Sequence, residues 1–158
     1  MSKPRARQTE LRGVSGYETS IKRTALAVLL VVVGIAWIAV YVNLAKDAAD
    51  FTPALGGKKP SDPLPWMSDL GLWNFAIGFG LIFLGLAVSA HKLTPLGRGR
   101  GVVIGMLGCF GIGLAWIVLF YFAGQDGPIP VMKDLDQYNL LVGIGFMAVG
   151  FTFATKWE

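Results

Sequence analysis

The polar residues that could do chemistry are few, and those that recur stand just before apolar stretches. Asp69 and Asn74 precede one such stretch, and Asp134 and Asn139 occupy the same places before another. An ionised Asp only accepts hydrogen bonds, whereas Asn carries both donors and an acceptor. The Asn side chains suit a helix N-terminal cap, a hydrogen bond between helices or the recognition of another membrane helix, and the Asp side chains suit the positive N-terminal ends of the apolar helices.

No constellation for catalysis or metal binding can be assembled from the sequence. Its single cysteine, Cys109, excludes an intramolecular disulfide, and one cysteine with one histidine, His91, cannot form a structural zinc site. A Ser-His-Asp triad and a catalytic pair of carboxylates are also missing. We therefore expect a protein that is not an enzyme, with no catalytic, cofactor-binding or metal-binding residues. Cys109 is expected to be a packing residue and His91 an interfacial anchor.

The composition indicates a membrane protein. Of the 158 residues, 54% are hydrophobic and 15% are charged, against a charged share of about 25% in soluble domains. Four apolar stretches, at 24–45, 71–90, 101–123 and 138–155, approach the roughly 20 residues that a helix needs to cross a bilayer. Their apolar runs are continuous, unlike the alternation of barrel strands. The sequence therefore predicts an all-α membrane protein with four transmembrane helices.

These stretches form an internal repeat. Segment 65–89 matches segment 130–154 without a gap, with eight identities in 25 positions, and missing such a repeat leads to a wrong fold. The sequence GIAWIAVY at 34–41 likewise matches GLAWIVLF at 113–120. We interpret the chain as two duplicated helical hairpins with a cytoplasmic linker between them. The ranges are 24–92 for the first two-span repeat, 93–100 for the linker and 101–158 for the second two-span repeat.

The charged residues predict an orientation. Lys and Arg number ten in the tail at 1–23, the segment 91–100 and the C-terminal end, and four in the loops at 46–70 and 124–137. Because basic residues collect on the cytoplasmic side, we expect a multi-pass plasma-membrane protein with both termini in the cytoplasm. A folded basic face is missing, so we expect no nucleic-acid partner.

Two segments outside the spans are expected to lack regular structure. The polar tail at 1–23 is predicted to be disordered, either as a solvated topogenic segment or as a docking segment for a cytoplasmic partner or anionic lipid. The loop at 46–70 contains several Pro and Gly residues, which disfavour helices and strands.

Small residues indicate where helices approach each other. They stand four positions apart on the second span, a spacing that lets helix backbones come close. The candidate helix-packing residues are Ala76, Gly80, Gly85, Ser89, Gly143 and Gly150. The candidate partner-binding residues are Trp66, Trp73 and Asn74, because Trp and Asn combine apolar surface with hydrogen-bonding groups at the membrane interface. In the alternative interpretation, both Trp side chains only anchor the helix among lipid headgroups.

The same region carries a resemblance to a known family. A basic tail, an aromatic-bearing first span and a loop precede the motif P-W-M-x-x-L-G-x-W-N-F-A-I, which begins at Pro65. This order resembles the actinobacterial CrgA family of cell division membrane proteins over about 24–92. The second copy reads Val131 and Tyr138 where the first has Trp66 and Trp73, so the chain resembles a tandem, diverged version.

The resemblance implies a non-enzymatic role in cell division. Such a protein scaffolds or regulates septum assembly between the FtsZ ring and septal penicillin-binding proteins, within membrane lipid and at the division septum. Two other functions stay open from the residues alone. One is a small transporter or channel subunit, which needs a polar pathway that these spans do not show. The other is a structural membrane protein unrelated to division, and either class is compatible with a homo-oligomer.

Overall fold

The computed structural model describes residues 19–53, 56–123 and 127–156. Most of the tail that was predicted to be disordered therefore lies outside the described residues. Its last part does not match the prediction, because helix α2 (Ile21–Val40) already begins at Ile21. Ser20 caps this helix, and its side-chain oxygen accepts a hydrogen bond from the Arg23 backbone N–H at 3.4 Å.

An all-helical architecture confirms the predicted class. Among the described residues, three helical stretches are long and apolar enough to cross a membrane, namely Ile21–Ala49, Arg100–Ala123 and Pro130–Ala154. A fourth apolar helix, α5 (Trp73–Ser89), is shorter, with 17 residues. The first stretch continues from α2 through a π-helical turn at Tyr41–Ala45 into the short helix α3 (Lys46–Ala49).

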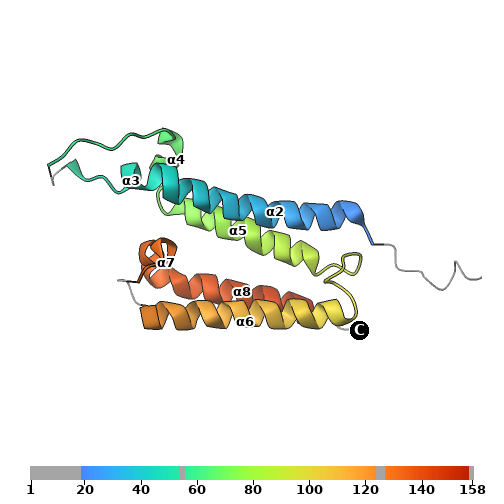
Figure 1. The fold of residues 1–158 in the computed structure, drawn as a ribbon. Coiled ribbons are helices and arrows are strands. Elements are labelled where there is room, and N and C mark those ends of the chain that lie inside the picture. Colours follow the sequence, from blue (N-terminus) through green and yellow to red (C-terminus); the bar gives the residue numbers. More distant parts are fainter. Residues whose placement is uncertain (1–18, 54–55, 124–126, 157–158) are drawn as a thin grey trace, which may run out of the picture.

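The helices form two antiparallel pairs that lie side by side (Figure 1). The first hairpin pairs α2 with α5, and the second pairs α6 (Arg100–Ala123) with α8 (Asn139–Ala154). Helices α5 and α8 are neighbours, so α2 and α6 lie on the outside. The start of α2 and the end of α8 lie at the same end of the molecule, which we call the linker end (Figure 1). The opposite end, which carries α3, is called the loop end.

In both hairpins, the two long helices contact each other at glycines in equivalent positions. A Cβ atom added to Gly34 on α2 would lie 2.6 Å from the carbonyl oxygen of Gly78 on α5. A Cβ atom added to Gly113 on α6 would lie 2.6 Å from the carbonyl oxygen of Gly143 on α8. Real Cβ atoms do not come this close to another atom. The backbones can therefore touch only because all four residues lack a side chain.

The predicted lack of regular structure in the loop at 46–70 was wrong. Besides α3, this loop contains α4 (Pro65–Leu70), and the corresponding loop of the second hairpin contains α7 (Pro130–Leu135). Each of these helices starts with its proline, where the missing N–H costs no hydrogen bond and the fixed φ suits a helix. The prediction treated every proline as a helix breaker and did not allow for a proline at the first position of a helix.

The corner after each short helix has the same unusual backbone. Gly71 follows α4 with φ +48°, and Asp136 follows α7 with φ +43°. Glycine adopts this conformation without steric cost, whereas Asp136 places a Cβ atom there. Both corners turn the chain from the short helix into the long apolar one.

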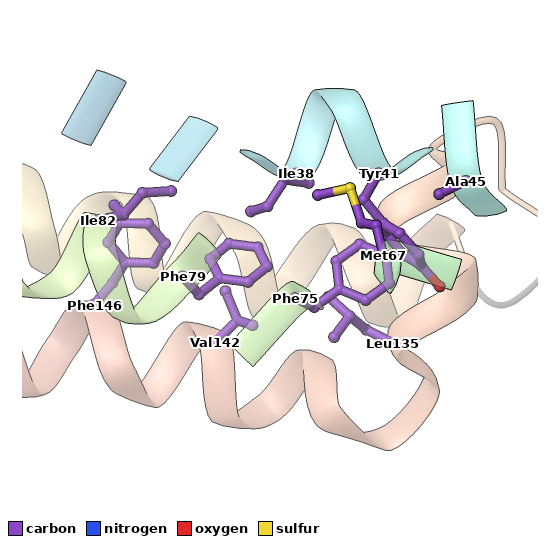
Figure 2. Packing of buried hydrophobic residues seen from close by; sticks show 10 residues of the cluster. All are labelled: Ile38, Tyr41, Ala45, Met67, Phe75, Phe79, Ile82, Leu135, Val142 and Phe146. Atoms are coloured by element: carbon purple, nitrogen blue, oxygen red, sulfur yellow. The ribbon is translucent and has the colours of Figure 1, made fainter. Parts of the chain in front are cut away.

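The main core fills the loop-end half of the molecule (Figure 2). Tyr41 and Phe75 meet edge to face in it, with ring centroids 5.2 Å apart. Phe83 of the first hairpin and Phe146 of the second also meet edge to face, at 5.1 Å, and so hold α5 against α8. The buried members of this core are Ile38, Tyr41, Ala45, Met67, Phe75, Phe79, Ile82, Leu135, Val142 and Phe146.

Candidate partner-recognition site

Asn74 joins α4 to α5 at the loop end. Its side-chain nitrogen donates to the backbone oxygens of Met67 at 2.7 Å and Gly71 at 2.9 Å, and the residue is 0% exposed. Carbonyl groups at the end of a helix lack partners within that helix. Asn74 therefore caps the C-terminal end of the preceding short helix and fixes the corner between the two helices. It does not cap the N-terminus of its own helix.

Asn139 does the same in the second hairpin. Its side-chain nitrogen donates to the backbone oxygens of Met132 at 2.6 Å and Asp136 at 2.8 Å. Its side-chain oxygen also accepts a hydrogen bond from the indole Nε1 of Trp116 on α6, at 3.2 Å. This bond crosses between helices, which was one of the two structural roles that the sequence left open for these asparagines.

The first hairpin lacks the bond between helices. Trp37 and Asn74 occupy the positions of Trp116 and Asn139, yet Trp37 Nε1 and Asn74 Oδ1 are both buried without a hydrogen-bond partner. The Trp37 ring instead packs against Trp66 of α4, with ring centroids 5.6 Å apart and planes inclined by 60°. A donor and an acceptor therefore lie unpaired beside the candidate motif.

The three candidate partner-binding residues differ in accessibility. Trp66 is 52% exposed and Trp73 is 72% exposed, so both present ring surface at the loop end. Asn74 is fully buried, and it can affect a partner only through the residues that it positions. Exposed tryptophans at a membrane interface can anchor a helix among lipid headgroups or serve as binding residues for a partner.

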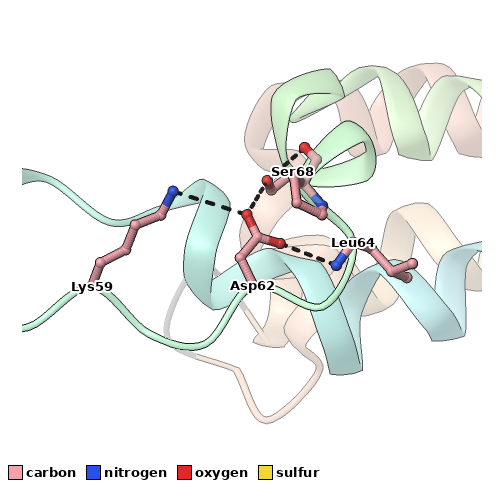
Figure 3. Close-up of polar contacts among 5 residues, drawn as sticks. Lys59, Asp62, Leu64 and Ser68 are labelled. Atoms are coloured by element: carbon pink, nitrogen blue, oxygen red, sulfur yellow. Dashed lines mark hydrogen bonds and ion pairs between the residues drawn. The ribbon is translucent and has the colours of Figure 1, made fainter.

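Asp62 fixes the start of the helix that carries Trp66 (Figure 3). One carboxylate oxygen accepts a hydrogen bond from the Leu64 backbone N–H at 3.3 Å, and the other accepts from the Ser68 hydroxyl at 2.7 Å. Lys59 lies 4.0 Å from the same carboxylate. These contacts hold the exposed Trp66 on an ordered turn of helix.

Trp73 also lines an apolar groove between α5 and α8. The groove has a volume of about 490 Å³. Two of the candidate helix-packing residues, Ala76 and Gly80, are on its α5 wall, and a Cβ atom added to Gly80 would meet nothing within 4 Å. The lining residues are Leu72, Trp73, Phe75, Ala76, Phe79, Gly80, Phe83, Leu135, Tyr138, Leu141 and Val142.

The other candidate packing residues on the first hairpin face inward. A Cβ atom added to Gly85 would lie 2.8 Å from the Ala27 carbonyl oxygen on α2. Ser89 is buried, and its hydroxyl donates to the Leu86 carbonyl oxygen at 2.6 Å within the same helix. Gly85 thus stands where α2 and α5 touch, whereas Ser89 satisfies its own hydroxyl locally.

The second hairpin places its candidate glycines in the same way. A Cβ atom added to Gly143 would lie 3.0 Å from the Gly113 carbonyl oxygen, and one added to Gly150 would lie 3.4 Å from the Met106 carbonyl oxygen. Both positions face α6. The residues that these two glycines face on α6, Gly113 and Met106, were not predicted as packing residues. Gly113 could have been, because it belongs to the repeated G-x-A-W-I segment.

An ion pair between the hairpins was also missed. Lys46 Nζ of α3 lies 3.1 Å from Asp134 Oδ1 of α7, with side chains only 20% and 13% exposed. Lys46 also pairs with Asp50 on its own segment. No repeat signal could reveal the Lys46–Asp134 pair, because it joins a residue of one hairpin to a residue of the other.

Basic residues gather at the linker end. Arg23 contacts the imidazole of His91, with Nη1 and Nδ1 3.0 Å apart. The Ser20 backbone N–H donates to the Leu93 carbonyl oxygen at 2.9 Å, and Arg98 donates to the Thr19 hydroxyl. These contacts fasten the segment between the hairpins to the start of α2. Within the described ranges, no group of three or more His, Cys, Asp or Glu side chains is arranged to hold a metal ion.

Comparison with known proteins identifies relatives of this chain. The family model described as "Cell division protein CrgA" matches residues 2–91 and 96–158. Curated proteins named cell division protein CrgA are similar over shorter segments. The protein from Streptomyces avermitilis is 51% identical over 53 residues, which is 34% of this chain and 60% of that relative. The protein from Corynebacterium aurimucosum is 32% identical over 75 residues, which is 44% of this chain and 80% of that relative.

A third relative is also similar over part of the chain. The protein from Mycobacterium sp. (strain KMS), also named cell division protein CrgA, is 34% identical over 71 residues, or 45% of this chain and 66% of that relative. The chain thus spans about 60% of the length of its Streptomyces relative and about two thirds of its Mycobacterium relative. No solved structure matches the chain.

Proposed function

The chain belongs to the CrgA family of cell division proteins, and on that premise we propose that it is a non-enzymatic scaffold of septum assembly. Its partners would be septal penicillin-binding proteins on one side and the FtsZ ring on the other. The protein would bind them at the septum through helix faces within the membrane and through its basic tail. Both of its termini would lie in the cytoplasm.

The exposed tryptophans at the loop end are the observation that supports this proposal. Trp66 and Trp73 flank the corner that Asn74 fixes through two hydrogen bonds to backbone oxygens. A fixed corner presents both rings without further ordering, and binding then costs less conformational entropy. Aromatic side chains of this kind often supply most of the binding free energy of an interface.

The experiment compares Trp73→Tyr with a matched change in the second hairpin. Tyrosine also anchors helices at the membrane interface, so an anchor should tolerate the replacement. A recognition residue should not, and we expect co-purification with septal penicillin-binding proteins to fall about tenfold. Tyr138→Phe, at the equivalent exposed position of the second hairpin, serves as the control.

Membrane insertion and the position of a fluorescent fusion are measured in parallel. Normal insertion with lost partners and a diffuse fusion would support the scaffold. If Trp73→Tyr inserts normally and keeps its partners and its septal position, then Trp73 is only an anchor. If the unmodified chain never concentrates at septa, the division scaffold itself is wrong.

A further inference from the structure

The two hairpins have equivalent packing but differ in one hydrogen bond. In the second hairpin, Trp116 Nε1 donates to Asn139 Oδ1 at 3.2 Å. In the first, the equivalent atoms of Trp37 and Asn74 are buried and unpaired. The glycine contacts that set the distance between the helices are the same in both hairpins, with 2.6 Å from an added Cβ atom to the facing carbonyl oxygen. Helix separation therefore does not explain the difference.

The asparagine does not explain it either. In both hairpins its side-chain nitrogen donates to the same two backbone oxygens of the preceding short helix and corner. Each side-chain oxygen is thus fixed in the same orientation. What differs is the partner of the tryptophan ring. Trp37 packs against Trp66, whereas the position of Trp66 in the second hairpin is occupied by Val131.

We propose that Trp66 is a positioning residue that holds Trp37 away from Asn74. Contact between the two indole rings is worth more than contact with a valine, and with this contact in place the Trp37 N–H has no hydrogen bond to Asn74. The first hairpin consequently retains an unpaired donor and an unpaired acceptor. In the second hairpin, the equivalent donor and acceptor form a hydrogen bond.

This inference rests on the proposed function where it concerns a partner. Trp66 is half exposed, so a partner helix that binds its ring would draw it away from Trp37. Trp37 would then donate to Asn74, as Trp116 donates to Asn139. Because buried unpaired polar groups carry a free-energy penalty, the new bond would offset part of the cost of separating Trp66 from Trp37. Recognition by the first hairpin would thus be coupled to a bond between α2 and α5.

Reciprocal substitutions test the positioning role in the full chain. The protein is labelled with ¹⁵N in its indole groups and placed in phospholipid nanodiscs, and Trp37→Phe and Trp116→Phe assign the two resonances. We expect the Trp116 N–H resonance downfield and slow to exchange, and the Trp37 N–H resonance upfield. Trp66→Val should move the Trp37 resonance downfield, toward that of Trp116. Val131→Trp should move the Trp116 resonance upfield.

The two substitutions provide independent outcomes. If Trp66→Val leaves the Trp37 resonance in place while the helix content is unchanged, Trp66 does not hold the pair open. Should Trp66→Val fail to fold, Val131→Trp decides, because a Trp116 resonance that stays downfield would equally overturn the proposal.

A binding measurement separates this inference from the proposed function. A purified septal penicillin-binding protein is added to the labelled chain. A downfield movement of the Trp37 resonance supports the coupling. If Trp66→Val moves the resonance but the added protein neither binds nor changes it, the positioning role stands and the proposed partner is wrong.

Discussion

Lys46 of the first hairpin forms an ion pair with Asp134 of the second, with Nζ and Oδ1 3.1 Å apart. The other carboxylate oxygen of Asp134 is buried and has no partner. This pair connects the two hairpins at the loop end, where the groove between α5 and α8 separates the helices.

Loss of this ion pair should loosen the contact between hairpins. Lys46→Ala would leave a mostly buried carboxylate without its cation, and we expect a loss of about 1–3 kcal/mol in the free energy of unfolding. Asp69→Asn is the matched control, because Asp69 is the exposed equivalent of Asp134 in the first hairpin. Thermal unfolding in detergent measures both variants. Equal stability of the two would show that the ion pair contributes nothing.

The contact glycines should not tolerate even one methyl group. Gly34→Ala and Gly113→Ala place a Cβ atom 2.6 Å from a backbone oxygen, so the helices must move apart. We expect each to cost about 1–3 kcal/mol, as overpacking does. Gly80→Ala and Gly108→Ala have open space around the new atom and should be neutral or stabilising, because Ala favours helix. Destabilisation by all four variants would contradict the assigned contacts.

The backbone strain at the corner of the second hairpin can be removed by a substitution. Asp136 has φ +43°, and glycine stands at the equivalent position of the first hairpin with φ +48°. Asp136→Gly should therefore raise the free energy of unfolding by about 1 kcal/mol. Gly71→Asp should lower it by a similar amount. Denaturation midpoints of the two variants, compared with the unmodified chain, should shift in opposite directions.

The two corner asparagines should differ in their contribution to stability. Asn74→Ala removes two hydrogen bonds to backbone oxygens. Asn139→Ala removes two such bonds and the bond from Trp116 as well. Asn139→Ala should thus cost about 1 kcal/mol more. The free energies of unfolding of both variants are measured under identical conditions. If Asn74→Ala is the less stable variant, the predicted order is wrong.

Orientation in the membrane can be read from single cysteines in a Cys109→Ala background. Ser61→Cys, in the loop between α3 and α4, should react with an impermeant reagent on intact cells. Ser15→Cys, in the basic tail, should react only after the membrane is opened, because the positive side faces the cytoplasm. Labelling of Ser15→Cys from outside would reverse the proposed orientation.

The length of the apolar runs and the composition predicted the long helices closely. The second span was expected at 71–90 and α5 covers Trp73–Ser89, while the third was expected at 101–123 and α6 covers Arg100–Ala123. Such spans are predictable because lipid leaves the backbone few alternatives to a helix. The short helices α4 and α7 were not predicted, since a proline at the first position of a helix resembles a proline that ends one.

The site was only partly visible in the sequence. Its repeated Asn and its tryptophans could be recognised, but their burial could not, and Asn74 proved inaccessible while Trp73 is exposed. The pairing of Trp37 with Trp66 depends on how α4 folds back against α2. The Lys46–Asp134 pair depends on how one hairpin lies against the other. Both arise from tertiary packing, which no local pattern records.

The equivalent glycine contacts of the two hairpins have an evolutionary consequence. In a symmetric dimer of identical hairpins, any substitution would appear on both halves at once. Here the halves belong to one chain, so one of them can carry Trp66 while the other carries Val131 on the same backbone frame. One chain therefore carries two hairpins with different surfaces, always in equal number, and no second protein is needed to supply the other surface.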